Sequence, residues 1–225
     1  MAQLECKNLT LGYGTKTVIE NLSFSVNKGD YLCIVGENGS GKTTLMKTIL
    51  RLQKPLEGQI TTGDGVLPDE IGYLPQQTQV QRDFPASVWE IVLSGCQSRC
   101  GKRPFYNKED KKKALEVLEI LKIKDLKKKI FSELSGGQRQ KVLLARSLCA
   151  TDKLLILDEP SNNLDQKSKS EFYTTLKHLY EGHGIYIMMI THDIDNDSLI
   201  GNKVLALSTD GYYFGKTDDY LEANI

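Results

Sequence analysis

The chain has 225 residues, of which 40% are apolar, and its 29 Lys and Arg residues are balanced by 29 Asp and Glu residues. This length can bury one sizeable hydrophobic core, or two small ones at most. A net charge of zero removes the bulk electrostatic attraction to nucleic acid, although it leaves room for a local basic patch.

The apolar runs are too short to cross a bilayer. The longest, residues 185–190, has six residues, whereas a membrane-spanning helix needs about 20. The N-terminal residues MAQLECKNLTLGYG lack a basic region followed by an apolar stretch, so we expect a cytoplasmic chain. Its cysteines are odd in number and include no CxxC pair, which argues against a disulfide framework. They are Cys6, Cys33, Cys96, Cys100 and Cys149.

The predicted elements alternate between strands and helices. Residues 4–26 show period-two stretches with a turn at Gly12-Tyr13-Gly14, which indicates an antiparallel β layer. Three later apolar runs, 31–35, 154–157 and 185–190, are expected to be strands. Helices should follow from about Lys42 and about Gln166, and an Asp-rich helical turn after residue 190. This order predicts an α/β fold with a parallel sheet flanked by helices, and the non-alternating run 154–157 belongs in its middle.

The middle of the chain, about 87–150, reads as a helical subdomain. Ala114, Leu115, Leu118 and Leu121 recur there at helix spacing. We expect one composite domain, with about 1–86 and 151–225 as the core and 87–150 as the inserted subdomain. Residues 99–129 contain 12 Lys and Arg against 5 Asp and Glu. This basic region is either a solvated helical face or a surface for anionic lipid headgroups or an acidic partner.

Cys96 and Cys100 lie within this middle part, four residues apart. They could share a helix face and contribute to a metal site. Buried free cysteine is the commoner use of the residue, and no second pair of ligands lies nearby in the sequence.

A phosphate-binding loop is predicted after the strand 31–35. Residues 36–43 match GxxxxGK[ST] and lie between a strand and a helix. Glycines let backbone N–H groups fold around phosphate oxygens, and the helix directs the positive end of its dipole toward them. Lys42 can then reach the β- and γ-phosphates, Thr43 can ligate Mg²⁺, and Thr44 can add a donor. The motif predicts a nucleoside triphosphate site made by Gly36, Glu37, Asn38, Gly39, Ser40, Gly41, Lys42, Thr43 and Thr44.

Two carboxylates, Asp158 and Glu159, follow the run 154–157. The carboxyl end of a central strand is where open α/β sheets build their sites. Adjacent strand residues point opposite ways, so the two carboxylates have different roles. Asp158 would hold Mg²⁺, directly or through water, and Glu159 would polarise the attacking water as general base. Capping of the next helix is the alternative role for this pair.

A histidine follows the last of the three apolar runs. Thr191-His192-Asp193 comes directly after residue 190. A single histidine after a strand is usually a polar loop residue. On a neighbouring strand of the same sheet, His192 could donate to the γ-phosphate and respond to its loss.

Leu134-Ser135-Gly136-Gly137-Gln138 is the signature of ATP-binding-cassette (ABC) ATPases, and the resemblance covers essentially the whole chain. Gln76 resembles the Q-loop glutamine of the family, and residues 161–165 (Ser-Asn-Asn-Leu-Asp) resemble its D-loop. His192 resembles the switch histidine, and Tyr13 the aromatic residue that stacks on adenine. Each motif appears once and in family order. Ser135 would also serve as the N-cap of a helix that runs through Ala150.

The resemblance implies a P-loop NTPase fold of the ABC type, with a mixed or parallel central sheet, an N-terminal antiparallel β layer and an inserted helical subdomain. It implies an ATPase whose cofactors are ATP and Mg²⁺. The implied catalytic residues are Glu159, His192, Gln76 and Lys42, and the implied metal ligands are Thr43, Gln76 and Asp158. Further implied nucleotide contacts are Tyr13, Ser135, Gly136, Gly137, Gln138 and Asp165.

Cassettes of this family pack head to tail, so that the phosphate loop of one copy and the signature turn of the other enclose each ATP. The resemblance therefore implies a homodimer that closes on ATP binding. It also implies a multi-span membrane permease as partner, an extracytoplasmic metal-binding protein in the same system, and a location on the inner face of the cell membrane.

The kind of cassette is inferred from the middle of the chain. Gln76 and Ser135 are 59 positions apart, which resembles the helical subdomain of transporter ATPases and leaves no room for a long coiled coil. Residues 83–95 look like the corresponding segment of bacterial zinc and manganese uptake ATPases, so we expect divalent metal import. Phe84 and Trp89 could line the socket for the permease, or Trp89 could belong to the core of the helical subdomain.

Other functions stay open on the sequence alone. Importers of iron chelates and of other substrates share every catalytic motif. A soluble ABC ATPase acting on nucleic acid or protein is supported only by the basic region, and no specific nucleic acid is expected. A purely structural nucleotide-binding module is disfavoured because Glu159, Gln76 and His192 are all present.

Overall fold

A computed structural model of the chain describes residues 3–14, 16–27, 29–63, 71–76, 85–101, 103–162, 164–192 and 201–223. The chain forms two compact units, Met1–Pro68 with Tyr186–Ile225, and Asp69–Ile185. The predicted helical subdomain 87–150 falls within the second unit, which also contains two strands and a long helix. Its bounds stay a prediction. In the described parts of the chain, no helix has the length and apolar character needed to span a membrane.

The first unit contains the antiparallel layer expected for residues 4–26. Strands β1 (Leu4–Tyr13), β2 (Lys16–Val26) and β4 (Glu57–Thr62) pair in the order β2-β1-β4. A β-bulge shifts the register after Cys6, where Asn8 has a positive φ of 49°, and the buried face resumes at Leu9. The expected turn lies later than predicted, since Gly12 and Tyr13 pair with the following strand and the turn begins at Gly14.

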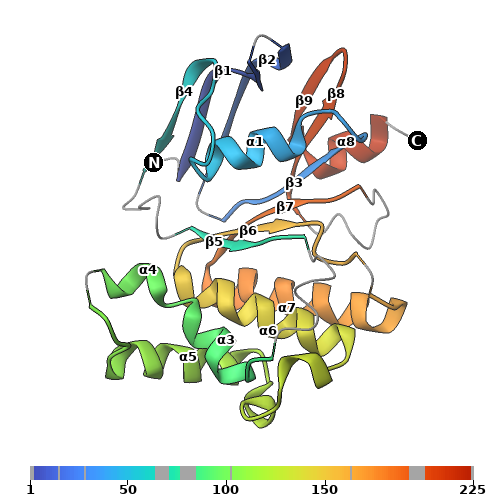
Figure 1. The fold of residues 1–225 in the computed structure, drawn as a ribbon. Coiled ribbons are helices and arrows are strands. Elements are labelled where there is room, and N and C mark those ends of the chain that lie inside the picture. The colour runs from blue at the N-terminus through green and yellow to red at the C-terminus, as the bar shows by residue number, and fades with distance from the viewer. Residues whose placement is uncertain are drawn as a thin grey trace. The chain divides into compact units, whose positions relative to one another are not determined.

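The second sheet of this unit is mixed. Strands β7, β3 and β8 run parallel in that order, and β9 joins β8 antiparallel. Helix α1 contacts both β1 and β3, and Figure 1 shows it between the two sheets. The bounds are β3 Tyr31–Gly36, α1 Lys42–Ile49, β7 Tyr186–Ile190, β8 Lys203–Ser208, β9 Gly211–Lys216 and α8 Thr217–Ala223.

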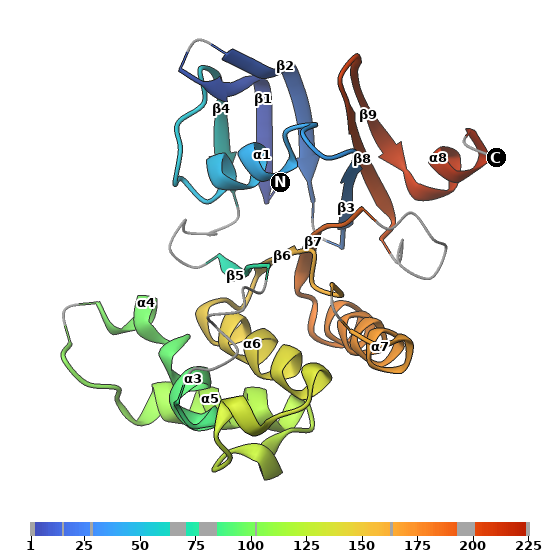
Figure 2. The same cartoon turned by 45° about the vertical axis from the view of Figure 1, so that its right-hand side comes forward.

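The second unit combines the parallel pair β5 (Gly72–Leu74) and β6 (Leu154–Asp158) with helices. Helix α6 is central because it contacts β5 as well as helices α3, α4, α5 and α7 (Figure 2). The other helices are α3 Val88–Ser94, α4 Gln97–Cys100, α5 Lys108–Ile120, α6 Gly136–Ala150 and α7 Gln166–His183, with 3₁₀ turns at Lys124–Leu126 and Phe131–Glu133. Capping boxes at Ser87, Asn107 and Ser135 start α3, α5 and α6 by satisfying otherwise free backbone N–H groups.

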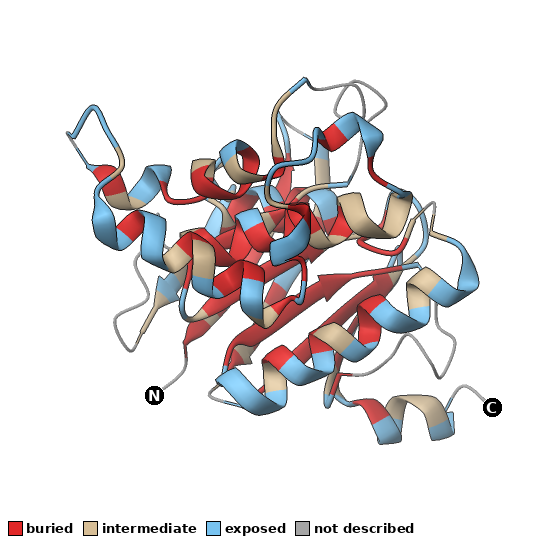
Figure 3. Ribbon diagram, turned by 90° about the horizontal axis from the view of Figure 1, so that it is seen from below, coloured by how far each residue is buried: buried red, intermediate tan, exposed pale blue. Residues whose placement is uncertain are grey.

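Burial follows the predicted apolar runs (Figure 3). Residues 154–157 are 0% exposed, as expected for a strand covered on both faces. On α5, Ala114 and Leu118 are buried as predicted, whereas Leu115 is half-buried and Val117 takes the inner position. All five cysteines are buried and free.

The contact of α3 with α6 generates a test of the packing in the second unit. A Cβ on Gly95 would overlap the carbonyl oxygen of Arg146 and lie 2.9 Å from the Cβ of Cys149. Gly95→Ala should therefore lower the free energy of unfolding by about 1–3 kcal/mol, as overpacked core positions do, measured by urea denaturation. Gly182→Ala is the matched control, since its Cβ would meet only His178 at 3.6 Å. Equal stability of the two variants would contradict this packing.

Candidate nucleotide-binding and catalytic site

Two glycines shape the phosphate loop of the first unit, because neighbouring strands lie too close to them for a side chain. Buried strand β3 delivers Gly36, where a Cβ would overlap the carbonyl oxygen of Leu207 and lie 2.8 Å from Ser40 Oγ. Gly41 precedes α1 in the left-handed region, with φ of 96°, and its Cβ would lie 2.7 Å from Ile19 Cδ1. Only glycine fits either position without displacing its neighbours. The predicted strand–loop–helix context of the motif is thus present.

The interior of this loop is suited to an anion. Lys42 is 6% exposed, and its Nζ donates to the carbonyl oxygens of Gly36 at 2.6 Å and Glu37 at 2.8 Å. Ser40 Oγ is buried and finds no hydrogen-bond partner among the described residues. A buried hydroxyl without a partner is costly in the absence of a ligand. A phosphate oxygen would accept a hydrogen bond from Ser40, and the charge of Lys42 would attract the anion.

Tyr13 and Thr44 also meet in this unit. Thr44 Oγ1 and Tyr13 Oη share a hydrogen bond of 3.1 Å, while the Tyr13 side chain is 51% exposed at the end of β1. Thr43 is exposed and Thr44 is buried. The exposed Tyr13 ring is therefore available as a stacking surface, and its hydroxyl is tied to the first turn of α1.

The structure brings His192 to the phosphate loop's edge of the sheet. Strands β3 and β7 are parallel neighbours, with Ile34 opposite Ile190, and the Thr191 N–H donates to the Ile34 carbonyl at 3.0 Å. Two residues beyond this pair lie Gly36 on one strand and His192 on the next. His192 is exposed there. The pairing register, which no single motif specifies, accounts for this placement.

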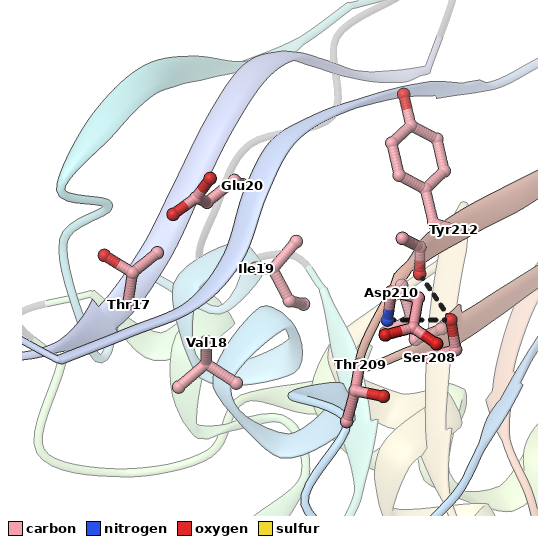
Figure 4. Close-up of a pocket in the computed structure, with 10 residues that line it drawn as sticks. Thr17, Val18, Ile19, Glu20, Ser208, Thr209, Asp210 and Tyr212 are labelled. Carbon is pink, nitrogen blue, oxygen red and sulfur yellow. Dashed lines mark hydrogen bonds between the residues drawn. The ribbon is translucent and has the colours of Figure 1, made fainter.

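A pocket of about 410 Å³ is lined by residues of β2 and of the β8–β9 hairpin, some of which lie close to the phosphate loop (Figure 4). One wall is residues 17–20 of β2, and the other is residues 207–212 of the β8–β9 turn. Val18 and Ile19 approach Gly41 from this side, and Leu207 approaches Gly36. Tyr13 is outside the pocket lining, so the pocket and the exposed tyrosine are separate surfaces of the same unit.

In the second unit, strands β5 and β6 bring Gln76 to the acidic pair. Leu74 lies opposite Leu157 in their parallel register, and two residues further on Gln76 Nε2 donates to Glu159 Oε2 at 2.8 Å. The sequence predicted a role for both side chains, but their contact depends on the pairing of two strands that are far apart in the chain.

Asp158 points to a different partner. Tyr73 Oη lies 3.4 Å from Asp158 Oδ2, and burial together with the Asp158 charge raises the pKa of Tyr73 to about 12. Tyr73 therefore stays a neutral donor that orients this carboxylate. Sequence reasoning missed Tyr73, and its position as the second residue of β5 carries no motif that would have revealed it.

The signature turn is an exposed helix start. Ser135 Oγ accepts from the Gln138 N–H at 3.3 Å, and Gln138 Oε1 accepts from the Ser135 N–H at 3.1 Å. The predicted N-cap and the helix through Ala150 are confirmed. A Cβ on Gly137 would lie 2.8 Å from Ser168 Oγ, near the start of α7.

Asp165 is the N-cap of α7. Its carboxylate accepts from the Ser168 N–H at 3.0 Å and from the Ser168 hydroxyl at 2.8 Å, and these hydrogen bonds hold the pKa of Asp165 below its usual range. The last residue of the D-loop motif therefore has a structural role in this chain.

The sequence also singled out Trp89, Phe84 and the pair Cys96 and Cys100. Trp89 is half-buried, and Lys127 Nζ lies 3.9 Å from its ring centroid. Phe84 lies outside the described residues, and so do residues 193–200 of the Asp-rich helical turn expected after residue 190. Cys100 Sγ contacts the Cys96 carbonyl oxygen at 3.5 Å, and within the described part of the chain no cluster of three or more His, Cys, Asp or Glu residues is arranged to hold a metal ion.

The α/β fold, the glycine-shaped loop and the carboxylates at strand ends define a P-loop nucleotide-binding protein. The model of the ABC transporter family matches residues 19–162, so the chain belongs to that family. It is the ATP-hydrolysing subunit of an ABC transporter, and such ATPases work with membrane permeases. The predicted fold class and enzymatic activity are confirmed.

Several relatives are named as parts of metal transport systems. The zinc import ATP-binding protein ZnuC of Hydrogenovibrio crunogenus is 34% identical over 207 residues, covering 91% of this chain and 78% of the relative. The manganese transport system ATP-binding protein MntB of Bacillus subtilis is 35% identical over 224 residues, covering 97% and 88%. The solved structure of a metal-chelate type ABC transporter in an inward-facing conformation is similar with a TM-score of 0.86 at 33% identity, covering 97% of this chain and 84% of that chain.

Lys42 provides a direct test of the phosphate loop. Lys42→Ala removes the buried cation and should weaken ATP binding about 10- to 100-fold, the range expected for hydrogen bonds to a charged group. Isothermal titration calorimetry with ATP measures the change. Lys47→Ala, on the exposed face of the same helix, is the control and should leave the affinity unchanged. An unaltered affinity of Lys42→Ala would rule out this loop as the phosphate site.

Proposed function

We propose that this chain energises the import of a divalent metal ion, zinc or manganese, through ATP-driven closure of a head-to-tail homodimer on a membrane permease. The ATP-hydrolysing activity belongs to the family. The choice of metal is supported by the names of the relatives, which include zinc and manganese systems. An extracytoplasmic metal-binding protein would deliver the ion, and the chain would act at the inner face of the membrane.

The observation that carries the catalytic assignment is the hydrogen bond between Gln76 and Glu159. It joins the end of β5 to the residue that follows β6, where a parallel sheet gathers its polar groups. Glu159 would accept a proton from the attacking water. Lys42 would neutralise charge on the β- and γ-phosphates, and His192 would donate a hydrogen bond to the γ-phosphate.

The donor set also fits Mg²⁺, a hard cation that prefers oxygen ligands. Asp158 supplies a carboxylate oriented by Tyr73, Thr43 supplies an exposed hydroxyl, and Gln76 supplies an amide oxygen. Because the Nε2 of Gln76 already faces Glu159, its Oε1 is the atom presented elsewhere. When bound, Mg²⁺ would neutralise phosphate charge and orient the β- and γ-phosphates.

We expect a dimer because a single chain contributes only half of each proposed nucleotide site. One chain has one phosphate loop and one signature turn at Ser135, where the exposed N-terminus of the 15-residue helix α6 can accept an anion. A second copy would place its own nucleotide there. Binding of the triphosphate would favour the closed dimer, and hydrolysis would release it.

Replacement of the base tests this cycle. Glu159→Gln keeps the volume of the side chain but cannot accept the proton, so we expect ATP binding to persist and an ATP-dependent dimer to accumulate. Size-exclusion chromatography with and without MgATP, together with phosphate release, measures both effects. Glu116→Gln, an exposed residue of α5 paired with Lys112, is the control and should behave like the unmodified chain. Normal turnover of Glu159→Gln would refute its assignment as base.

The transported substrate is tested separately. The chain should co-purify with a multi-span permease that stimulates its ATPase activity, and cells that lack the chain should require added zinc or manganese. A requirement for a sugar, a peptide or haem would reject metal import. ATPase activity stimulated by nucleic acid, with salt-dependent binding, would instead favour the basic region as a functional surface.

A further inference from the structure

The carboxylate of Glu159 accepts hydrogen bonds from two side-chain amides. Gln76 Nε2 lies 2.8 Å from Glu159 Oε2, and Asn162 Nδ2 donates to the same oxygen. An ionised carboxylate only accepts, so each amide must turn its NH₂ group toward Glu159 and its oxygen away. The structure thereby assigns the orientation of both amides without reference to a ligand.

The two amides reach Glu159 by different routes. Gln76 follows β5 and is 83 positions away in sequence, whereas Asn162 is three residues from Glu159 within one turn. The Asn162 N–H also donates to the Glu159 carbonyl oxygen at 3.2 Å. The Asn162 bond is therefore local, and it does not depend on the position of another strand.

The turn that carries Asn162 is fixed on both sides. Buried Gln140 of α6 donates from Nε2 to the Pro160 carbonyl oxygen at 2.6 Å, and Tyr173 of α7 lies with its hydroxyl 3.0 Å from Ser161 Oγ. Glu159 itself has a φ of 45°, a left-handed conformation that is unfavourable for a residue with a side chain. Such a conformation persists only where the surroundings hold it.

We propose that Asn162 is a positioning residue for the general base, holding the Glu159 carboxylate in its orientation whenever the Gln76 amide turns toward the metal or the nucleotide. This inference rests on the proposed role of Glu159. Asn162 itself touches neither substrate nor metal in this assignment and acts through Glu159.

The test compares substitutions of Asn162 in the full chain by steady-state ATP hydrolysis over a range of ATP concentrations. Asn162→Ala removes the donor, so kcat should fall about tenfold while the KM for ATP changes less than twofold. Asn162→Asp keeps nearly the same size and shape but replaces the NH₂ donor with an acceptor of like charge, so its kcat should fall at least as far.

Controls separate positioning from folding and from the proposed function. Gln97→Ala removes an exposed amide of the same unit that accepts from Tyr106, and its kinetics should match those of the unmodified chain. The midpoint of thermal denaturation of Asn162→Ala should be unchanged. A normal kcat for Asn162→Asp, or a KM for ATP that rises as much as kcat falls, would show that the donor does not position the base and would overturn the proposal.

The Glu159→Gln variant completes the set. If it is inactive while Asn162→Ala and Asn162→Asp hydrolyse ATP at the normal rate, the positioning role is wrong and the role of Glu159 stands. If Glu159→Gln itself turns over normally, both the base assignment and the role of Asn162 are overturned.

Discussion

Parallel strand pairing is the constraint on which the rest of the structure depends. In a parallel pair, residues in register leave the sheet at the same edge, so polar groups that follow neighbouring strands are brought together. Two pairs of parallel strands in this chain bring polar groups together in this way. In the first unit β3 and β7 carry Gly36 and His192 to one edge, and in the second β5 and β6 carry Gln76 and Glu159 to one edge. Slippage of either pair by one residue would separate these groups.

Buried polar groups in the phosphate loop explain why this edge of the sheet in the first unit is suited to an anion. Lys42 is enclosed in the phosphate loop and held by two backbone carbonyl oxygens, while Ser40 Oγ is buried without a described partner. Removing a cation and a hydroxyl from water costs free energy. Charge-assisted hydrogen bonds to a phosphate group would offset this cost. The glycines make this arrangement possible because the backbone of β8 and the side chains of β2 lie where a Cβ would project.

The motifs allowed much of the site to be predicted. The phosphate loop, the helix that begins at Lys42, the N-cap at Ser135 and the buried strand before Asp158 all appear as expected, because each depends on residues adjacent in sequence. Tyr73 and Asn162 could not be assigned roles this way. Their importance comes from contacts with Asp158 and Glu159, and neither residue type has a preference strong enough to reveal such a contact. The turn predicted at Gly12-Tyr13-Gly14 lies later in the structure for a related reason, because cross-strand pairing extends β1 through Tyr13.

The sequence by itself determined the chemistry of this protein: a glycine loop with a lysine, a carboxylate pair after an apolar run, and a serine that caps a glycine-rich helix start. These signals are local, because caps, turns and burial periodicity act over a few residues. Only the tertiary structure decided which of these groups meet. The Gln76–Glu159 contact, the turn fixed by Gln140 and Tyr173, and the placement of His192 depend on strand register and helix packing between segments far apart in the chain.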